Sequence, residues 1–183
     1  MILRKCLLLI VMGLTVFAIA CGGPQPDSQR DANSVASQKP APMANITIKD
    51  ATAVAGGKAV LEIELDSVDD IGVIVFTLNF DPAVFKYAST SLAPGVPKEA
   101  VLSLNDKQTA SGKLGVLIDS TKAFEKGRKS IVTATFQIAK DAIAGDYQFT
   151  FTSNPAILSV ATINAELVNA KFPPGIIHVA AAR

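Results

Sequence analysis

The sequence predicts an all-β fold, a sandwich of two packed sheets. Nine or ten short segments rich in Val, Ile and Thr are separated by Gly, Pro, Asn and Asp. Most of these segments alternate apolar and polar residues, as a strand with one face in a core does. Helical periodicity is nearly absent, and many short strands without helices are typical of a β-sandwich.

The predicted strands follow one another from residue 45 almost to the C-terminus. In the second of them, Leu61, Ile63 and Leu65 alternate with Glu62 and Glu64, so one face belongs to a core and the other to water. Turn-forming residues bound each strand. In chain order the predicted strands are 45–50, 58–66, 71–80, 84–90, 100–106, 113–119, 130–138, 146–152, 156–163 and 175–180.

Residues 1–20 are predicted to be a signal peptide, because a positive start is followed by an apolar run and small residues suited to cleavage. The apolar run is too short for a permanent membrane span. The tetrapeptide AIAC, residues 18–21, resembles a bacterial lipobox, although Ala18 stands where leucine is usual. This resemblance implies that Cys21 is acylated, and two or more acyl chains would anchor the chain stably to a membrane. A secreted protein with a chance cysteine is the alternative.

Residues 21–44 are predicted to be the acylated cysteine followed by a disordered linker. The segment is rich in Gly, Pro, Ser, Gln and Ala and lacks apolar periodicity. The globular domain is therefore predicted at 45–183. Once the signal peptide is removed, Cys21 is the only cysteine, so no internal disulfide can form, and acylation accounts for the unpaired thiol.

The composition argues against a nucleic-acid partner and against catalysis. Without the signal peptide, 15 basic residues (17 − 2) face 16 acidic ones, which leaves no basic field for nucleic acid. His178 is the only histidine and is expected to be structural, so no cysteine–histidine pair or zinc site is available. Glu62 and Glu64 share a face but are interpreted as the solvated side of a strand, not as glycosidase carboxylates. We expect no enzyme, no cofactor and no metal site.

An acidic segment and the aromatic content bear on calcium binding and on polysaccharide binding. The acidic segment DSVDD, from Asp66 to Asp70, holds oxygen ligands suited to calcium, but such a loop is more often a solvated turn. Polysaccharide binding usually needs flat Trp or Tyr rings, and the chain has no Trp and only Tyr87 and Tyr147. Neither signal is decisive.

The segment IGVIVFTLNF, residues 71–80, has an unexpected outward face. Ile74, Phe76 and Leu78 alternate into the core, so Val73 and Val75 fall where a half-exposed strand should be polar. One interpretation is an exposed apolar patch that contacts a partner. The others are a local loop that covers the strand, or a strand buried on both faces.

Three segments in order resemble the cohesin family. IGVIVFTLNFDPAVFKYAST, residues 71–90, has the alternating strand that ends in an aromatic residue, then Asp-Pro, one turn and another strand. GVLIDST, residues 115–121, matches a strand that ends in an acidic-Ser turn, and 130–151 matches a later Thr-Phe strand with its linker and glycine. The resemblance covers about 46–179. It implies a jelly-roll sandwich of about nine strands, related in fold to cellulose-binding modules.

The resemblance also implies a binding face and a function. In cohesins, the outward face of the strand that matches 71–80 belongs to the sheet that receives a dockerin, although many cohesins have polar residues where the two valines stand. We therefore predict a non-catalytic, lipid-anchored module for protein adhesion or scaffolding at the bacterial envelope, on the outer membrane or on the outer face of the cytoplasmic membrane. Its partner would be a dockerin-like or envelope protein, and polysaccharide binding is the alternative. The predicted partner face comprises Val73, Val75, Thr77, Asn79 and Ile118.

Overall fold

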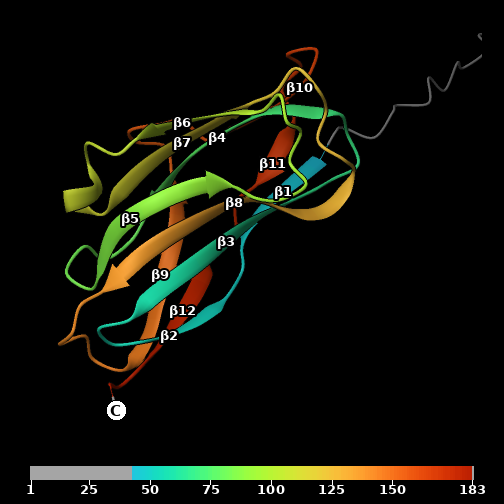
Figure 1. Cartoon of the computed structure of the whole chain (residues 1–183). Helices are drawn as coiled ribbons and strands as arrows, with labels where there is room; N and C mark the ends of the chain where they lie inside the picture. The colour runs from blue at the N-terminus through green and yellow to red at the C-terminus, as the bar shows by residue number, and fades with distance from the viewer. Residues whose placement is uncertain (1–42, 183) are drawn as a thin grey trace, which may run out of the picture. The chain divides into compact units, whose positions relative to one another are not determined.

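The computed structural model describes residues 43–182 and confirms the all-β sandwich. Two sheets pack face to face (Figure 1), and the only helical element of the described residues is the 3₁₀ turn η1 (Thr109–Ser111). No helix within this range is long and apolar enough to cross a membrane. The predicted signal peptide, Cys21 and most of the predicted linker lie outside the described residues.

The first sheet is built around the strand with the clearest alternation in the sequence. Its long central strands pair along ten residues, from Lys58–Gln137 to Ser67–Gly127. The sheet is antiparallel except at one edge, where a three-residue strand pairs in parallel. In spatial order it consists of β11 (Asn169–Lys171), β1 (Met43–Ile48), β3 (Lys58–Ser67), β8 (Gly127–Ile138) and β5 (Phe85–Leu92).

The second sheet contains the segment with the unexpected valines as a central strand. On one side that strand pairs with a single neighbour from Val73 to Asn79, and on the other it pairs with two shorter neighbours, end to end. In spatial order this sheet consists of β2 (Ala51–Val54), β12 (Gly175–Ala180), β9 (Gly145–Thr152), β4 (Ile71–Asn79), β7 (Lys113–Asp119) and β6 (Val101–Asn105), and β10 (Ser159–Thr162) also pairs with β4.

Residues 43–182 form twelve strands, where the resemblance implied about nine. Each predicted segment contains a strand, and the two strands that were not predicted are β2 and β11, of four and three residues. Both lie at sheet edges and pair in parallel with a strand distant in sequence. The first strand of the described residues begins at Met43, two residues before the first predicted strand.

Phenylalanines fill the middle of the sandwich between the two sheets. Phe136 from β8 contacts Phe80 and Phe149 edge-on, with ring centroids 4.9 and 5.2 Å apart. Phe85 contacts Phe149 in the same geometry at 4.9 Å. Each such pair stabilises the fold by about 0.5–1.5 kcal/mol beyond the contribution of the apolar area that it buries. This cluster ties β4 and its Asp-Pro turn to both sheets and fixes which residues of β4 face outward.

Candidate docking face

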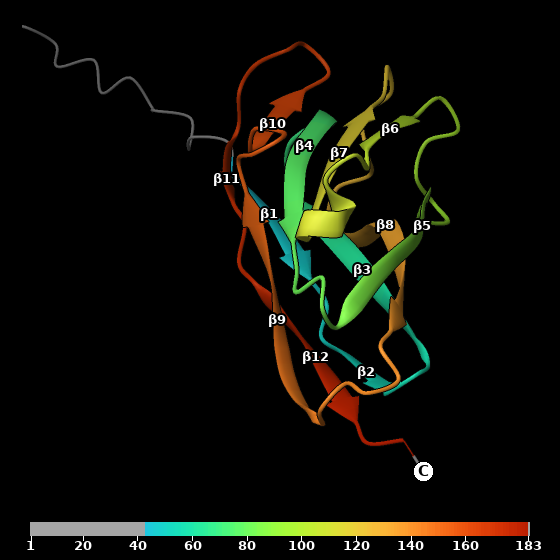
Figure 2. The same cartoon turned by 90° about the vertical axis from the view of Figure 1, so that its left-hand side faces the viewer.

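β4 alternates between the core and the outer surface of its sheet. Ile74, Phe76 and Leu78 are completely buried between the sheets, as predicted. The intervening residues point to the opposite side. Figure 2 shows β4 between β10 and β7, with β6 beyond β7 at the edge of the sheet. The outward residues of β4 are Val73, Val75, Thr77 and Asn79, of which Thr77 is fully buried and the others are partly exposed.

The prediction that Ile118 belongs to this face is wrong. Ile118 lies opposite Ile74 in the β4–β7 ladder, and both side chains are completely buried in the core. Residues directly opposite each other in an antiparallel pair point to the same side of the sheet. Ile118 therefore holds the two sheets together and has no surface for a partner.

Leu117 and Asp119 are the outward residues that the prediction missed on this strand. Leu117 lies opposite Val75 and is 36% exposed, and Asp119 lies opposite Val73. The sequence carried the signal, because Leu114, Val116 and Ile118 alternate in KLGVLID as an inward set. The prediction chose Ile118 in place of its neighbour Leu117, and a shift of one residue along a strand exchanges its two faces.

Thr77 lies on the outer side of the sheet but is covered by the chain that follows β9. Its hydroxyl donates a hydrogen bond to the carbonyl of Ala156 at 3.0 Å and accepts one from the amide of Ala156 at 2.8 Å. Gly115 lies opposite Thr77, and a Cβ at Gly115 would be 3.5 Å from side-chain atoms of both Pro155 and Ala156. The segment 154–156 therefore rests on the sheet at this row and withdraws Thr77 from solvent.

The other half of the face is uncovered and apolar. The pairing places Val101, Asp119 and Val73 side by side in one row, and Ser103, Leu117 and Val75 in the next. Val101 is 60% exposed and Leu117 is 36% exposed. We define the apolar face as Val73, Val75, Val101 and Leu117. Two of the three interpretations of 71–80 thus each describe one half of the strand: a segment covers Thr77, and Val73 and Val75 are partly exposed.

Few charged groups interrupt the apolar face. Exposed Asp119 lies between Val101 and Val73, and Lys113 lies opposite Asn79 at the far end of the strand. Asn79 donates a hydrogen bond from Nδ2 to Thr150 Oγ1 at 3.4 Å. A partner would therefore meet apolar side chains at the β10 end of β4 and polar ones at the β9 end.

Two of the three aspartates weighed as calcium ligands contact cations of the chain itself. Asp66 contacts Arg128 at 3.4 Å, and Asp70 contacts Lys126 Nζ at 3.1 Å. Within residues 43–182, no group of three or more His, Cys, Asp or Glu side chains is arranged to hold a metal ion. The segment comprises the end of β3, Asp66 and Ser67, and the turn that leads to β4.

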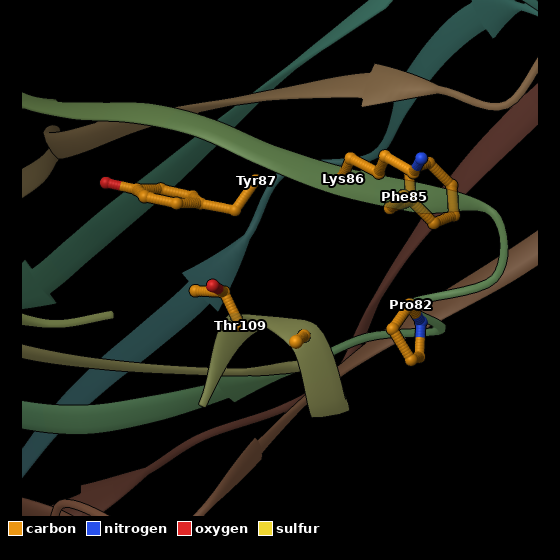
Figure 3. Close-up of a pocket in the computed structure, with 6 residues that line it drawn as sticks. Pro82, Phe85, Lys86, Tyr87 and Thr109 are labelled. Carbon is orange, nitrogen blue, oxygen red and sulfur yellow. The ribbon is translucent and has the colours of Figure 1, made fainter. Parts of the chain in front are cut away.

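Both tyrosines pack edge-on against the aromatic core. Tyr147 contacts Phe85 with ring centroids 5.5 Å apart and donates its hydroxyl to the carbonyl of Ile143, and Tyr87 contacts Phe136 at 6.0 Å. Tyr87 also borders a hollow of about 350 Å³ between β5 and η1. Figure 3 shows Tyr87, Lys86 and Phe85 along β5 on one side of this hollow and Thr109 and Pro82 on the other.

Comparison with known proteins identifies the domain. A family model described as the cohesin domain matches residues 44–172, which is most of the described chain. No curated protein sequence matches the chain.

Solved cohesin structures have the same fold. The seventh ScaB type I cohesin from Pseudobacteroides cellulosolvens has a TM-score of 0.65 at 20% identity, over 77% of this chain and 94% of that chain. In the Coh-OlpA–Doc918 complex from Clostridium thermocellum, a type I cohesin–dockerin complex, the matching chain has a TM-score of 0.64 at 17% identity, over 75% and 99%. A non-cellulosomal cohesin from the archaeon Archaeoglobus fulgidus has a TM-score of 0.63 at 13% identity, over 75% and 91%.

Proposed function

Because this chain belongs to the cohesin family, whose domains are non-catalytic binding modules, we propose that it is a lipid-anchored scaffolding protein of the bacterial envelope. Its domain binds a dockerin or a dockerin-like envelope protein. The observation that carries this proposal is the uncovered apolar face on the outer side of β4, β7 and β6. A contiguous apolar patch on a soluble domain marks a contact site.

Dockerins are the favoured class of partner because structures of similar cohesins have been solved in complex with dockerins. The OlpA cohesin structure contains Doc918, and the sixth ScaB cohesin of Acetivibrio cellulolyticus was solved with the Cel5 dockerin. On this chain the valines and Leu117 provide few hydrogen-bonding groups at the centre of the face. We expect the partner to present apolar side chains there, and polar ones toward Asn79 and Lys113.

The test is a binding titration of residues 22–183 with purified dockerin modules. Leu117→Asp should weaken binding at least about 100-fold, because an unpaired carboxylate would be buried at the interface. Val75→Asp should act in the same direction. Binding measured by calorimetry that survives both changes would place the partner elsewhere.

Val60→Asp is the matched control. Val60 is 50% exposed on the outer side of the other sheet, so the change adds the same charge to a similar apolar side chain. Dockerin binding should be unaltered. An equal loss in this variant would show a nonspecific effect of added negative charge.

The anchor rests on the lipobox-like residues 18–21 and on the linker composition. Acylated Cys21 would fix the chain to the outer membrane or to the outer face of the cytoplasmic membrane, with the linker as a spacer. In Cys21→Ser cells, the protein should leave the membrane fraction or remain uncleaved. Normal maturation together with membrane retention would refute the anchor without affecting the binding face.

Polysaccharide binding is the second candidate, and the hollow beside Tyr87 gives it a place. The ring of Tyr87 borders the hollow opposite Thr109, so a sugar could contact an aromatic edge and a hydroxyl (Figure 3). We expect retention on insoluble cellulose or chitin to be weak, because the Tyr87 ring packs on Phe136 and is only partly exposed. Strong retention that disappears in Tyr87→Ala would make this the leading function.

A further inference from the structure

The strand orders of the two sheets end in four edge strands, and three of them are protected against pairing with another chain. Besides these, β10 pairs with β4 alone among the strands and carries an isolated bridge between Ala161 and Leu167. β11 has three residues and is followed by Pro173 and Pro174, and β2 has four residues. β5 carries Lys86, and its register with β8 shifts between Tyr87 and Ser89. Short length, proline, lysine and irregular register are the usual means of blocking edge-to-edge association.

The fourth edge strand, β6, is one residue longer than β2 and lacks the other protections. Its sequence VLSLN contains no charge, proline or glycine, and it pairs with β7 in unbroken register from Val101 to Asn105. Val101 is 60% exposed and Leu104 is 38% exposed. Within the described residues no strand pairs with its other side, and Figure 2 shows it at the border of the sheet. Its free backbone groups can receive another strand.

We propose that β6 pairs with β6 of a second copy of this chain, antiparallel and centred on Ser103. Antiparallel pairing of a strand with its own copy gives a closed two-fold dimer, whereas an offset contact would continue into a filament. In this register all five residues of β6 are paired, and Leu102 of each copy lies opposite Leu104 of the other. Centring on Leu104 instead would place Leu102 opposite Asp106, a mismatch of apolar and charged side chains.

The charges that flank β6 fit the same register. If the register continued two positions into the flanking turns, it would bring Glu99 of one copy, which Lys122 of its own chain contacts at 2.6 Å, toward Lys107 of the other. The symmetry repeats this approach. Asp106 comes toward Ala100 instead of a second acidic group. The residues that flank the strand therefore set no two acidic groups opposite each other in this register.

The dimer would join the two apolar faces. A two-fold axis perpendicular to a continuous sheet keeps corresponding faces on the same side. Val101 of each copy then lies beside the seam, and the two docking faces form one surface across β4, β7, β6 and their symmetry copies. The contact involves five residues from each copy, so the dimer belongs to the weak class below about 1,000 Å² of buried area.

The experiment is disulfide trapping in residues 22–183, a segment with no cysteine because the only two are Cys6 and Cys21. The segment contains the whole β-sandwich with its own core. Ser103→Cys places two thiols directly opposite each other, where Cα atoms are about 4.5–5.5 Å apart. A disulfide needs about 4.4–6.8 Å. Mild oxidation should give a covalent dimer on a non-reducing gel at least about tenfold faster than in the control variants.

Two controls separate pairing from random collision. Asn105→Cys lies on the same strand, but the proposed register keeps its two copies about 14 Å apart. Ser89→Cys lies exposed on the protected edge strand β5. Both should remain mainly monomeric, and in the trapped Ser103→Cys dimer alternate amides of β6 should gain protection from hydrogen exchange. Equal dimer formation in the three variants, or a Ser103→Cys chain that stays monomeric, would overturn the proposal.

A charge variant tests the contact without a covalent bond. Ser103→Asp sets two carboxylates opposite each other at the axis, so concentration-dependent sedimentation of the unaltered segment should be lost while the melting temperature stays the same. Unchanged self-association in Ser103→Asp would also reject the β6 contact. These measurements need no partner, so they stand apart from the dockerin titration.

Discussion

The outer faces of the two sheets have the same strand geometry and opposite chemistry. On the five-stranded sheet, Glu62 accepts hydrogen bonds from Lys49 Nζ and Ser130 Oγ, each at 3.2 Å. On the seven-stranded sheet, the corresponding outward positions of β4 and β7 carry Val73, Val75 and Leu117. On the first face these polar groups pair with each other around Val60, the single exposed apolar residue of β3, whereas on the second the apolar side chains lie in neighbouring rows.

This difference identifies a set of apolar side chains that does not contribute to the core of the sandwich. Antiparallel sheets ordinarily cover one face with core and expose polar residues on the other, and β3 follows that rule. Val73 and Val75 of β4 are partly exposed and lie on the opposite side from the core, which Ile74, Phe76 and Leu78 enter. An apolar surface that folding does not require is best explained by a contact made after folding.

Ile118→Asp should have the largest effect and would break the seven-stranded sheet from its inner side. The side chain is completely buried opposite Ile74, so an unpaired carboxylate there would cost several kcal/mol. Most of the stability of a domain of this size would be lost. Chemical denaturation followed by circular dichroism measures the change. A folded Ile118→Asp with near-native stability would mean that the register of β7 is wrong.

Thr77→Val should have the next largest effect and tests how the apolar face is limited. The change leaves the amide and the carbonyl of Ala156 without their hydroxyl partner, at a cost of about 1–3 kcal/mol. Thr77→Ser keeps the hydroxyl and serves as the control. Hydrogen exchange at Ala156 should accelerate in the valine variant only. Equal exchange in both variants would show that 154–156 is held by other contacts.

The sequence predicted the inner side of the sandwich better than its outer side. Alternation identifies core residues such as Leu61 and Phe76 because burial imposes a period of two along each strand. The cover over Thr77 could not be read from the sequence, because Ala156 is 79 residues away and the contact depends on how the chain leaves β9. β2 and β11 were not predicted for a similar reason. Whether such short segments form strands depends on pairing with a strand that is distant in the sequence.

Ile118 was a different kind of error, because the pattern that places it inside was present in KLGVLID. The family resemblance identified the correct neighbouring strand. The prediction placed Ile118 on the outward face of that strand, although the adjacent residue, Leu117, is the one that points outward. The alternation of apolar residues within β7 alone predicts Leu117 as the outward residue. Resemblance locates a strand, but period-two analysis decides which residues reach the surface.

Leu117→Asp and Val60→Asp should have small and similar effects on stability, although they lie on the two contrasting faces. Both side chains are exposed, at 36% and 50%, so each added carboxylate remains hydrated. Such surface changes usually stay within about 0.5 kcal/mol. Thermal melts compare them with the unaltered domain. If Leu117→Asp melted as low as Ile118→Asp, the outward side of β7 would be covered and the proposed docking face would fail.

Glu62→Gln should have the smallest effect, and it tests the polar face by its dependence on pH. Hydrogen bonds from Lys49 and Ser130 hold the pKa of Glu62 below its usual value. A carboxyl with a lowered pKa in the folded state stabilises the fold above its unfolded pKa, and that contribution disappears as the pH falls through the folded pKa. The pair is exposed, so the contribution at neutral pH is at most about 1 kcal/mol and is reduced by salt. The difference in unfolding free energy between Glu62→Gln and the unaltered domain should therefore shrink from about pH 7 to about pH 2. A difference that grew on acidification would mean that Glu62 is held in its protonated form, and the polar face would then need a different account.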